Sequence, residues 1–412
     1  MSQPRPLEGI RVLDLTVALS GPYGSLLLAG MGAEVIRIES PSGGDIARTN
    51  PPFVGESGIH FGAPEDGDVS LTILNRARNK KSITLDLKSA EGRAIFLDLA
   101  KQADVVMENM SEGATKRLGV TYQDVAQVNP AIIYASIKAF GEDPSVYPGL
   151  KGMDIIVQAL SGIMEVTGFA DGPPTRIGIP MADLIAPLYS VNGILAALIQ
   201  RGRDGKGQHV QVSMLDCLAS LVAEEHFDIF GKAGYPRRSG NTQDRLAPFG
   251  VYDSTDGCVA IVAFSPDWMR GLCDAMGRPD IMEDPRLNSR GPRMRHADEM
   301  NSIVQSWVGT LSSDEVVKAL VSRGVPCAPV RTPDQVLHDP ALIERGAVME
   351  LEHPRYGKMG AMGMGMPIHF SRSDAQFDRP ALDLGASNEE IYGSILDYSP
   401  EKIAELRQRK II

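Results

Sequence analysis

Short apolar runs alternate with helix-like segments between residues 10 and 140, and this alternation constrains the fold more than any other feature. Residues 10–15 (IRVLDL) and 34–39 (EVIRIE) have the length and pattern of strands, and a helix-like stretch, SLLLAGMG, follows Gly21-Pro22 between them. Such a strand–helix–strand unit predicts two parallel strands that are joined by a right-handed crossover.

The same signals recur further along the chain. Strands are predicted at 83–87, 105–108, 132–137 and 209–214, and helices at 89–102, 122–127 and about 154–164. Because strands and helices alternate, we expect an open α/β domain that is built on a parallel sheet.

The chain has 412 residues, which is long for a single core, so two domains are expected. Residues 1–224 are predicted to form the N-terminal part of a large domain. A β-hairpin signal at 249–263, followed by two helical stretches, marks 225–330 as a smaller α+β domain. Residues 331–412 form the return segment and the C-terminal part of the large domain, and the methionine-rich run 359–366 is interpreted as a loop or an apolar wall.

Composition excludes several functional classes. The net charge of −11 argues against a nucleic-acid binder. The four cysteines form no CxxC pair and the seven histidines no HExxH spacing, so neither a disulfide framework nor a metal site is expected. The opening MSQPRPLEG lacks the features of a signal sequence, and the apolar stretch 184–199 is short for a bilayer span. A soluble cytoplasmic protein without a membrane partner is expected.

Signature sequences for other chemistries are missing. Neither GxGxxG nor GxxxxGK[ST] occurs at a strand-to-helix junction, which disfavours dinucleotide and P-loop chemistry. No serine lies in a GxSxG elbow, so a serine triad is disfavoured as well.

Basic residues crowd one region of the sequence, and most are expected to be solvated: Arg76, Arg78, Lys80, Lys81, Lys88, Arg117, Lys138 and Lys151. Lys88 and Lys138, however, follow predicted parallel strands. Ligands of open α/β sheets bind at the carboxyl ends of the strands, so these cations suit a phosphate-bearing ligand.

Asp183 stands where a Gly/Pro loop, Gly178-Ile179-Pro180, meets an apolar helix-like segment. One interpretation is an N-cap, because an Asp carboxylate accepts the free N–H groups of a first helical turn. The other is a nucleophile at a positive helix end, which would also stabilise the oxyanion that develops on attack. The two interpretations are compatible, and the residue pattern does not separate them.

Several strings resemble the class III CoA-transferases, also called the CaiB/BaiF family, in order and spacing from about residue 6 to 397: LEGIRVLDLT, NKKSITLDLKSAEGR, VVMENMSEGATKRLGV, GKGQHVQVSMLD and GVPCAPVRT. The resemblance implies a Rossmann-like large domain built from both chain ends and a smaller middle domain. It also implies an interlocked homodimer. The substrates would be an acyl-CoA and a small carboxylic acid, with no tightly bound cofactor.

The family nucleophile is an Asp between a Gly-containing loop and an apolar helix, so the resemblance assigns that role to Asp183 in GIPMAD. Asp183 would attack the acyl-CoA thioester to form a mixed anhydride, and the CoA thiolate would then form an aspartyl-CoA thioester. The resemblance also carries over a set of coenzyme A contacts: Leu85, Lys88, Asn109, Arg117 and Lys151.

The sequence departs from the formyl-CoA transferase type of the family at several positions. Val17 and Leu19 stand where that type has His and Gln, and Ser40 replaces an Arg. The tetraglycine loop of that type is absent, and its nearest counterpart is residues 238–241. Formyl/oxalate exchange is therefore disfavoured.

Other functions remain as alternatives. The related 2-methylacyl-CoA racemases use a His in a GHD string, and here that position holds Met153, which cannot take a proton. An intramolecular transferase that acts on one dicarboxylate is not excluded, and Arg48 or Arg176 would suit its second carboxylate. A non-catalytic CoA-binding protein and a nicotinamide-dependent oxidoreductase are the rivals from other classes.

Overall fold

The computed structural model describes residues 4–56, 58–143 and 146–412. The prediction that the chain has no signal sequence concerns the opening residues 1–9, and residues 1–3 lie outside the described part of the chain. The chain forms two compact units: unit 1 comprises Met1–Ser161, Gly178–Glu224 and Leu337–Ile412, and unit 2 comprises Gly162–Ile177 and Glu225–Val336. We retain the domain limits at 224–225 and 330–331 as a proposal and describe each unit by itself.

Unit 1 is built on a six-stranded sheet with the order β6-β2-β1-β7-β8-β9, in which every neighbouring pair is parallel. The strands are β1 (Arg11–Asp14), β2 (Glu34–Glu39), β6 (Lys80–Thr84), β7 (Val105–Glu108), β8 (Ile133–Lys138) and β9 (Gln208–Ser213). The chain runs outward from β1 to one edge, returns, and continues from β7 to the other edge. This is the strand order of a Rossmann-like fold, so the predicted α/β class is confirmed.

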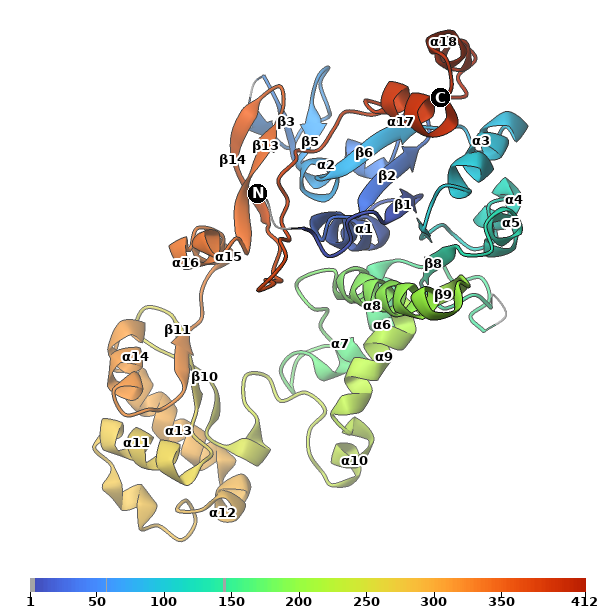
Figure 1. The fold of residues 1–412 in the computed structure, drawn as a ribbon. Helices are drawn as coiled ribbons and strands as arrows, with labels where there is room; N and C mark the ends of the chain where they lie inside the picture. The colour runs from blue at the N-terminus through green and yellow to red at the C-terminus, as the bar shows by residue number, and fades with distance from the viewer. Residues whose placement is uncertain (1–3, 57, 144–145) are drawn as a thin grey trace. The chain divides into compact units, whose positions relative to one another are not determined.

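Helices cover both faces of this sheet (Figure 1). Alternate residues of β1 face opposite sides. Val12 packs with the apolar residues of α1 (Ser20–Gly30) and α8 (Met181–Asp204). Leu13 packs with those of α3 (Ala90–Ala100), α5 (Tyr122–Val128), α17 (Asn388–Leu396) and α18 (Pro400–Gln408). Strands that are buried on both faces read as continuous apolar runs, which is why their prediction succeeded.

The C-terminal segment completes the edge of the sheet at β6 (Figure 1). Asn388 of α17 accepts the backbone N–H of Thr84 at 2.9 Å and donates to its hydroxyl at 2.8 Å. The Tyr392 hydroxyl donates to the Thr84 carbonyl at 2.7 Å. The two ends of the chain therefore share one core.

Unit 2 contains a three-stranded antiparallel sheet of β10 (Phe249–Asp253), β11 (Cys258–Val262) and β12 (Cys327–Pro329). The hairpin predicted at 249–263 is confirmed, whereas β12 was not predicted. An apolar core joins the sheet to α11 (Pro266–Met276), α13 (Ala297–Val308) and α14 (Ser313–Val321). Unit 2 is thus a small α+β body.

The remaining α-helices and β-strands of the described chain are α2 (Leu71–Arg76), α4 (Ala114–Leu118), α6 (Asp154–Leu160), α7 (Ile163–Val166), α9 (Met214–Glu224), α10 (Phe227–Lys232), α12 (Arg290–Arg295), α15 (Pro333–Leu337), α16 (Pro340–Glu344), β3 (Phe53–Gly55), β4 (Gly58–His60), β5 (Val69–Ser70), β13 (Val348–His353) and β14 (Gly357–Met364). Among the described residues, α8 alone is long and apolar enough to cross a membrane, a test that core helices of soluble proteins also pass.

Two predictions about local structure were wrong. The strand predicted at 83–87 lies three residues earlier, at Lys80–Thr84, because the polar Lys80 and Lys81 pair with β2 and the apolar run continues beyond the ladder. For the methionine-rich run 359–366 only the loop interpretation was wrong, because most of the run lies in strand β14, which pairs with β13. Its alternating Gly and Met residues have weak strand preference, so the pairing with β13 decides its conformation. Met359, Met364 and Met366 pack against apolar clusters, as expected of an apolar wall.

Candidate active site

Asp183 lies in the first turn of α8, as the third residue of the helix. The N-cap position is Pro180, which makes no side-chain cap hydrogen bond, so the N-cap interpretation of Asp183 was wrong. The helix begins three residues earlier than that interpretation required, because Met181, Ala182 and Asp183 already belong to the helix.

Asp154, the first residue of α6, caps α8 in place of a local residue. Its Oδ1 accepts the backbone N–H of Ala182 at 2.8 Å and that of Asp183 at 3.3 Å, and its Oδ2 accepts a hydrogen bond from Gln158 Nε2 at 2.7 Å. Among the described residues, none donates a hydrogen bond to the Asp183 carboxylate. The capping carboxylate and the unpaired carboxylate are thus different residues.

The environment of Asp183 changes its acidity. Burial raises the pKa of the Asp183 carboxyl to about 6, and the negative charge of Asp154 adds to the rise. The positive charge of Arg76 opposes it. A carboxylate with a raised pKa is more nucleophilic than an ordinary one, and at neutral pH it is still mainly ionised.

Asn109 follows β7 and fixes the loop that follows β1. Its side chain accepts the backbone N–H of Val17 at 2.8 Å, and its amide donates to the Val17 carbonyl at 2.9 Å and to the Ser20 hydroxyl at 3.1 Å. β1 and β7 are neighbours at the point where the strand order reverses, which is where ligands of this fold class bind. Asn109 therefore fixes the loop after β1 at the edge of the sheet where a ligand is expected.

A buried ion pair between Lys80 and Asp14 supports the same loop after β1. Lys80 Nζ donates to Asp14 at 3.1 Å, to the Pro22 carbonyl at 2.9 Å and to the Ser25 hydroxyl at 2.6 Å. Asp14 also accepts the backbone N–H of Thr16 at 3.0 Å. Lys80 and Asp14 are almost completely buried, so the start of α1 is held by charge-assisted hydrogen bonds inside the protein.

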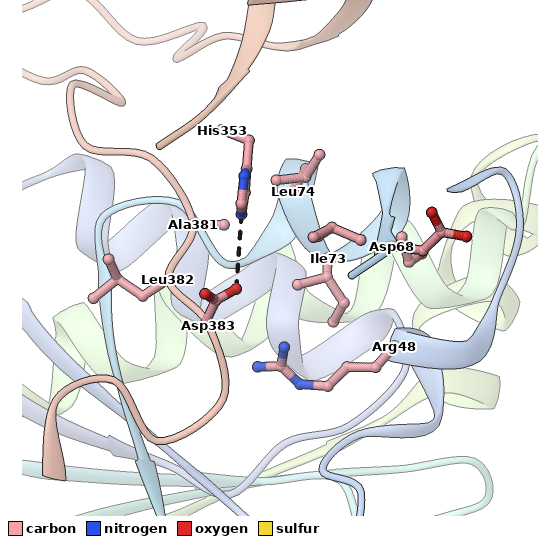
Figure 2. A pocket seen from close by; sticks show the side chains of 10 residues that line it. Arg48, Asp68, Ile73, Leu74, His353, Ala381, Leu382 and Asp383 are labelled. Atoms are coloured by element: carbon pink, nitrogen blue, oxygen red, sulfur yellow. Dashed lines mark ion pairs between the residues drawn. The ribbon is translucent and has the colours of Figure 1, made fainter. Parts of the chain in front are cut away.

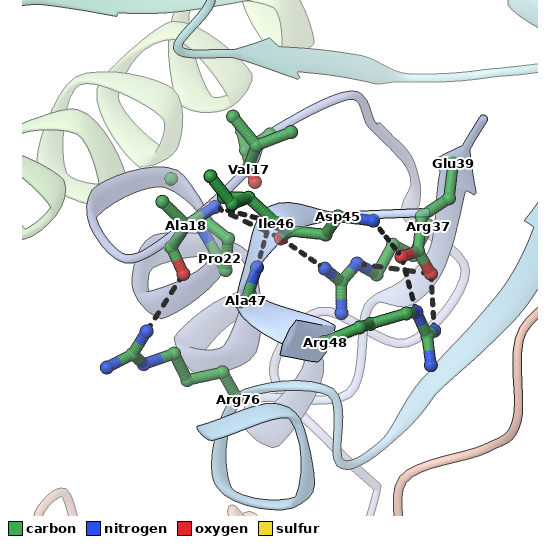
Figure 3. Close-up of polar contacts among 12 residues, drawn as sticks. Val17, Ala18, Pro22, Arg37, Glu39, Asp45, Ile46, Ala47, Arg48 and Arg76 are labelled. Carbon is green, nitrogen blue, oxygen red and sulfur yellow. Dashed lines mark hydrogen bonds and ion pairs between the residues drawn. The ribbon is translucent and has the colours of Figure 1, made fainter. Parts of the chain in front are cut away.

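Arg76 and Asp45 also fix the loop after β1, through the backbone of Ala18 (Figure 3). The Asp45 carboxylate accepts the backbone N–H of Ala18 at 3.0 Å, and Arg76 Nη1 donates to the Ala18 carbonyl at 2.9 Å. Ala18 has a φ of 63°, a left-handed conformation that is uncommon for a residue with a side chain. Contacts to both of its backbone groups hold it there.

The predicted coenzyme A contacts lie in four segments of unit 1. Leu85 and Lys88 follow β6 and Asn109 follows β7, so their positions are at the carboxyl edge of the sheet. Arg117 lies in α4, and Lys151 precedes α6 next to Gly152, which packs against Ala139 at the end of β8. Lys88, Arg117 and Lys151 are exposed. Leu85 is 2% exposed and packs in the core, so a ligand would reach only its backbone.

Three of the crowded basic residues are buried or largely buried: Arg78 and Lys80, which were expected to be solvated, and Lys138, which was expected to suit a phosphate-bearing ligand. Arg78 donates to the Met364 carbonyl at 2.6 Å, and Lys80 pairs with Asp14 as described above. Lys138 pairs with Glu108 at 2.7 Å. Their charges satisfy internal carbonyl and carboxylate groups, which a charge pattern in the sequence does not reveal, so Lys138 is already paired within the protein.

A cavity of about 110 Å³ in unit 1 is lined by residues of α2, β5 and the C-terminal return (Figure 2). His353 and Asp383 face each other across it at 3.7 Å, and burial lowers the pKa of His353. Arg48 also lines it, but its guanidinium is held by Glu39 at 2.8 and 2.6 Å. Asp183 and the predicted coenzyme A contacts do not line this cavity.

A larger cavity, of about 350 Å³, lies within unit 2. Its walls include Phe227, Phe230 and Tyr235, and Arg245 lies over the Phe230 ring at 5.3 Å. Arg245 pairs with Glu225 at 2.7 Å. None of the predicted site residues lines this cavity either.

Two residues near Asp183 were not recognised from the sequence. Asp154 stands directly after Met153 in the string GMD, and Arg76 is one of several basic residues crowded in the same region of the sequence. The available signal for Asp154 was an acidic residue at the start of a helix, which is common and unspecific. Among the described residues, no group of three or more His, Cys, Asp or Glu is arranged to hold a metal ion.

Comparisons with known proteins agree on one family. The family model for "CoA-transferase family III" matches residues 7–388. A succinyl-CoA:mesaconate CoA-transferase from Haloarcula hispanica is 37% identical over 352 residues, which cover 84% of this chain and 86% of the relative. A formyl-CoA:oxalate CoA-transferase from Streptomyces coelicolor is 34% identical over 429 residues, which cover 99% of each chain. The crystal structure of a CaiB/BaiF family protein from Brucella suis has a TM-score of 0.81 at 31% identity and covers 95% of this chain and 100% of its own.

Proposed function

The chain belongs to CoA-transferase family III, and on this premise we propose that Asp183 is the nucleophile that carries both the acyl group and coenzyme A during transfer. The protein is a CoA-transferase, an enzyme whose substrates are CoA thioesters and carboxylates. The observation that supports Asp183 is a half-buried carboxylate with a raised pKa and no hydrogen-bond donor among the described residues.

The reaction begins with attack of an Asp183 oxygen on the thioester carbon of the donor. The C–S bond breaks, which releases the CoA thiolate and leaves a mixed anhydride between the acyl group and Asp183. The thiolate then attacks the side-chain carbonyl of Asp183, the anhydride C–O bond breaks, and the donor acid leaves as a carboxylate. Asp183 now carries coenzyme A as an aspartyl thioester.

The acceptor carboxylate repeats these steps in reverse order. It attacks the aspartyl thioester, releases the thiolate and forms a second anhydride with Asp183. The thiolate attacks the acceptor carbonyl, which yields the new CoA ester and regenerates the Asp183 carboxylate. No proton is gained or lost overall, so the site needs a positioned carboxylate and a retained thiolate rather than a general base.

Asp154 positions Asp183 in this scheme. It occupies the backbone N–H groups of Ala182 and Asp183, which are therefore not available as oxyanion donors. These helix-end N–H groups therefore do not stabilise the oxyanion, contrary to the expectation from the sequence. Asp154 instead fixes the first turn of α8, and its charge adds to the rise that burial causes in the pKa of Asp183.

We assign coenzyme A to the carboxyl edge of the sheet, with Lys88, Arg117 and Lys151 near its phosphates and Asn109 near the crevice. Three exposed cations at or near this edge support the assignment, because they suit the phosphates of the ligand. Leu85 would contribute a backbone contact. Family members such as a succinyl-CoA:mesaconate CoA-transferase suggest succinyl-CoA as the donor and a small dicarboxylate or hydroxy acid as the acceptor.

An interlocked homodimer without a membrane or nucleic-acid partner, located in the cytoplasm, belongs to the same proposal. Exposed apolar side chains on α6, α8 and α9, which contact one another within unit 1, support an interface with a second copy: Ile155, Leu160, Leu188, Tyr189, Ile199 and Leu221. Light scattering after gel filtration should give twice the 44.4 kDa chain mass. A monomer at micromolar concentration would contradict the dimer.

Two alternatives remain within the family. An intramolecular transferase would form the same intermediates on one dicarboxylate and would exchange label between its two carboxyl groups without an added acceptor. A 2-methylacyl-CoA racemase is disfavoured because Met153 precedes Asp154 at the start of α6, and a thioether cannot exchange a proton.

The test is a panel of acyl-CoA donors and carboxylic acids with Asp183→Ala. We expect the variant to lose transfer while it retains CoA binding, and hydroxylamine or borohydride should trap the aspartyl thioester at Asp183 in the parent. Asp216→Ala is the matched control, because Asp216 is the exposed third residue of α9. Residual turnover of Asp183→Ala within about tenfold of the parent would overturn the assignment.

A further inference from the structure

Arg76, the last residue of α2, has hydrogen-bond donors that the protein does not use. Its Nη1 donates to the Ala18 carbonyl at 2.9 Å, and this is its one hydrogen bond with the described residues. Nε and Nη2 have no such partner, and neither is sealed inside the protein. A half-buried guanidinium with two accessible nitrogen donors that no protein group accepts can bind an added acceptor.

The neighbouring arginines are paired with carboxylates, whereas Arg76 is not (Figure 3). Arg37 pairs with Asp45 at 2.5 Å, and Arg48 donates hydrogen bonds to the Glu39 carboxylate from both Nε and Nη2. Within the described chain, no carboxylate lies within ion-pair distance of Arg76. Asp45 and Glu39 are already committed to Arg37 and Arg48, so Arg76 keeps a charge that the protein leaves without a direct partner.

Arg76 lies near Asp183 through the packing of α1 against α8. Arg76 holds the loop at Ala18 that leads into α1. A Cβ atom on Gly24 of α1 would lie 3.1 Å from Cβ of Pro187, one turn after Asp183 in α8, so the two helices approach closely there. Burial raises the pKa of Asp183 and lowers that of Arg76, and the opposite charge of each group counters the shift in the other. The two charges are therefore close enough to interact, although the two side chains form no ion pair.

We propose that Arg76 binds the distal carboxylate of a dicarboxylic acyl group while the other carboxyl group of that acid reacts at Asp183. The inference rests on the proposed function of Asp183 and names the substrate class: dicarboxylic acids and their CoA monothioesters. The planar guanidinium offers parallel N–H donors that match the two oxygens of a carboxylate. The distal carboxylate takes no part in bond making and serves to orient the acid.

This assignment differs from the one expected from the sequence. Arg48 and Arg176 were the arginines named for a second carboxylate. Arg48 is occupied by Glu39, and Arg176 donates to the neighbouring Ile177 carbonyl at 3.0 Å. Arg48 and Arg76 both belong to the unit of Asp183, but Arg48 is paired with a carboxylate and Arg76 is not.

The experiment compares donors that differ in the distal group alone. Succinyl-CoA and butyryl-CoA have the same chain length, and glutaryl-CoA and pentanoyl-CoA form a second matched pair. The full-length parent should prefer the dicarboxylic donor of a pair. In Arg76→Gln, kcat/KM for that donor should fall roughly 10- to 100-fold, the loss expected for a hydrogen-bonded charge, while the monocarboxylic donor changes less than about threefold. Arg76→Lys keeps the positive charge but lacks the paired planar N–H donors of the guanidinium, so its kcat/KM for the dicarboxylic donor should lie between those of the parent and Arg76→Gln.

Arg48→Gln serves as the control arginine, and it should leave the ratio between matched donors unchanged. A purely structural role of Arg76 predicts an equal loss for both donors of a pair, and that result would overturn the inference. Parent enzyme that prefers monocarboxylic donors would overturn it as well. Failure of the proposed function is distinct, because it would appear as full transfer by Asp183→Ala or as no transfer by the parent with any donor.

Discussion

Asp154 Oδ1 lies 3.3 Å from the backbone nitrogen of Asp183 and 2.8 Å from that of Ala182. One carboxylate thus caps the helix that carries another, across 29 residues of sequence. The arrangement leaves the Asp183 side chain free of the capping role that an acidic residue at a helix start usually has. It also brings a second negative charge near Asp183, which adds to the rise that burial causes in the pKa of Asp183.

Transfer should depend on pH through Asp183. Its pKa is about 6, and the protonated acid cannot attack a thioester. We expect kcat/KM to be constant above neutral pH and to fall about tenfold per pH unit well below 6. The measurement is a pH–rate profile with one donor and one acceptor at saturating acceptor. The acidic limb of the profile is the fall of kcat/KM at low pH. If this fall began only near pH 4, the range of an ordinary carboxyl group, it would contradict the raised pKa of Asp183.

Replacement of Asp154 by Asn should separate its two roles. The Asn side-chain oxygen still accepts a backbone N–H, but the negative charge is gone, so the pKa of Asp183 should fall and the acidic limb should move to lower pH. Asp154→Ala also removes the cap and should cost about 1 kcal/mol of unfolding free energy. Urea unfolding and pH–rate profiles of both variants test this. An unchanged acidic limb in Asp154→Asn would mean that Asp154 acts on Asp183 by capping alone.

Asp183 should reduce stability at neutral pH. Its pKa is raised in the folded protein above the ordinary value of 3.8, so the folded state binds a proton more tightly than the unfolded state between about pH 4 and 6. Stability is therefore lost as pH rises through this window. Asp183→Asn should be more stable than the parent at pH 7.5, by on the order of 1–3 kcal/mol, and the difference should vanish below about pH 4.

Thermal unfolding of the parent and Asp183→Asn at pH 4, 6 and 7.5 measures this difference. The gain should appear without any transfer activity, which separates it from the catalytic test. A variant that is less stable than the parent at pH 7.5 would show that the ionised carboxylate contributes favourable contacts.

The buried pair of Lys80 and Asp14 should be a large contributor to the integrity of unit 1. Lys80→Ala leaves the Asp14 charge buried without its partner and should cost about 3–5 kcal/mol. Lys81→Ala is the matched control, because Lys81 is partly exposed and its pairs with Glu34 and Glu390 should contribute no more than about 1 kcal/mol. Urea unfolding of both variants gives the comparison. Equal costs would show that the Asp14 pair is not more important than a surface pair.

The sequence determined the sheet and the position of the proposed nucleophile. The apolar runs of β1, β2, β7 and β8 and the alternating pattern of β9 predicted strands within one or two residues, because strand and helix periods are local properties of the chain. Asp183 was found because the loop before it and the helix after it lie next to it in sequence. The hairpin at 249–263 was predicted for the same reason.

The tertiary structure alone decided which groups meet around Asp183. Asp154 lies 29 residues from Asp183, and Lys80 lies 66 residues from Asp14, so no local pattern joins them. Arg37, Arg48 and Arg76 are equivalent charges in the sequence, and only the fold supplies carboxylates to the first two and leaves the third free. The identity of a residue follows from the sequence, whereas its partners follow from the long-range packing that brings distant segments together.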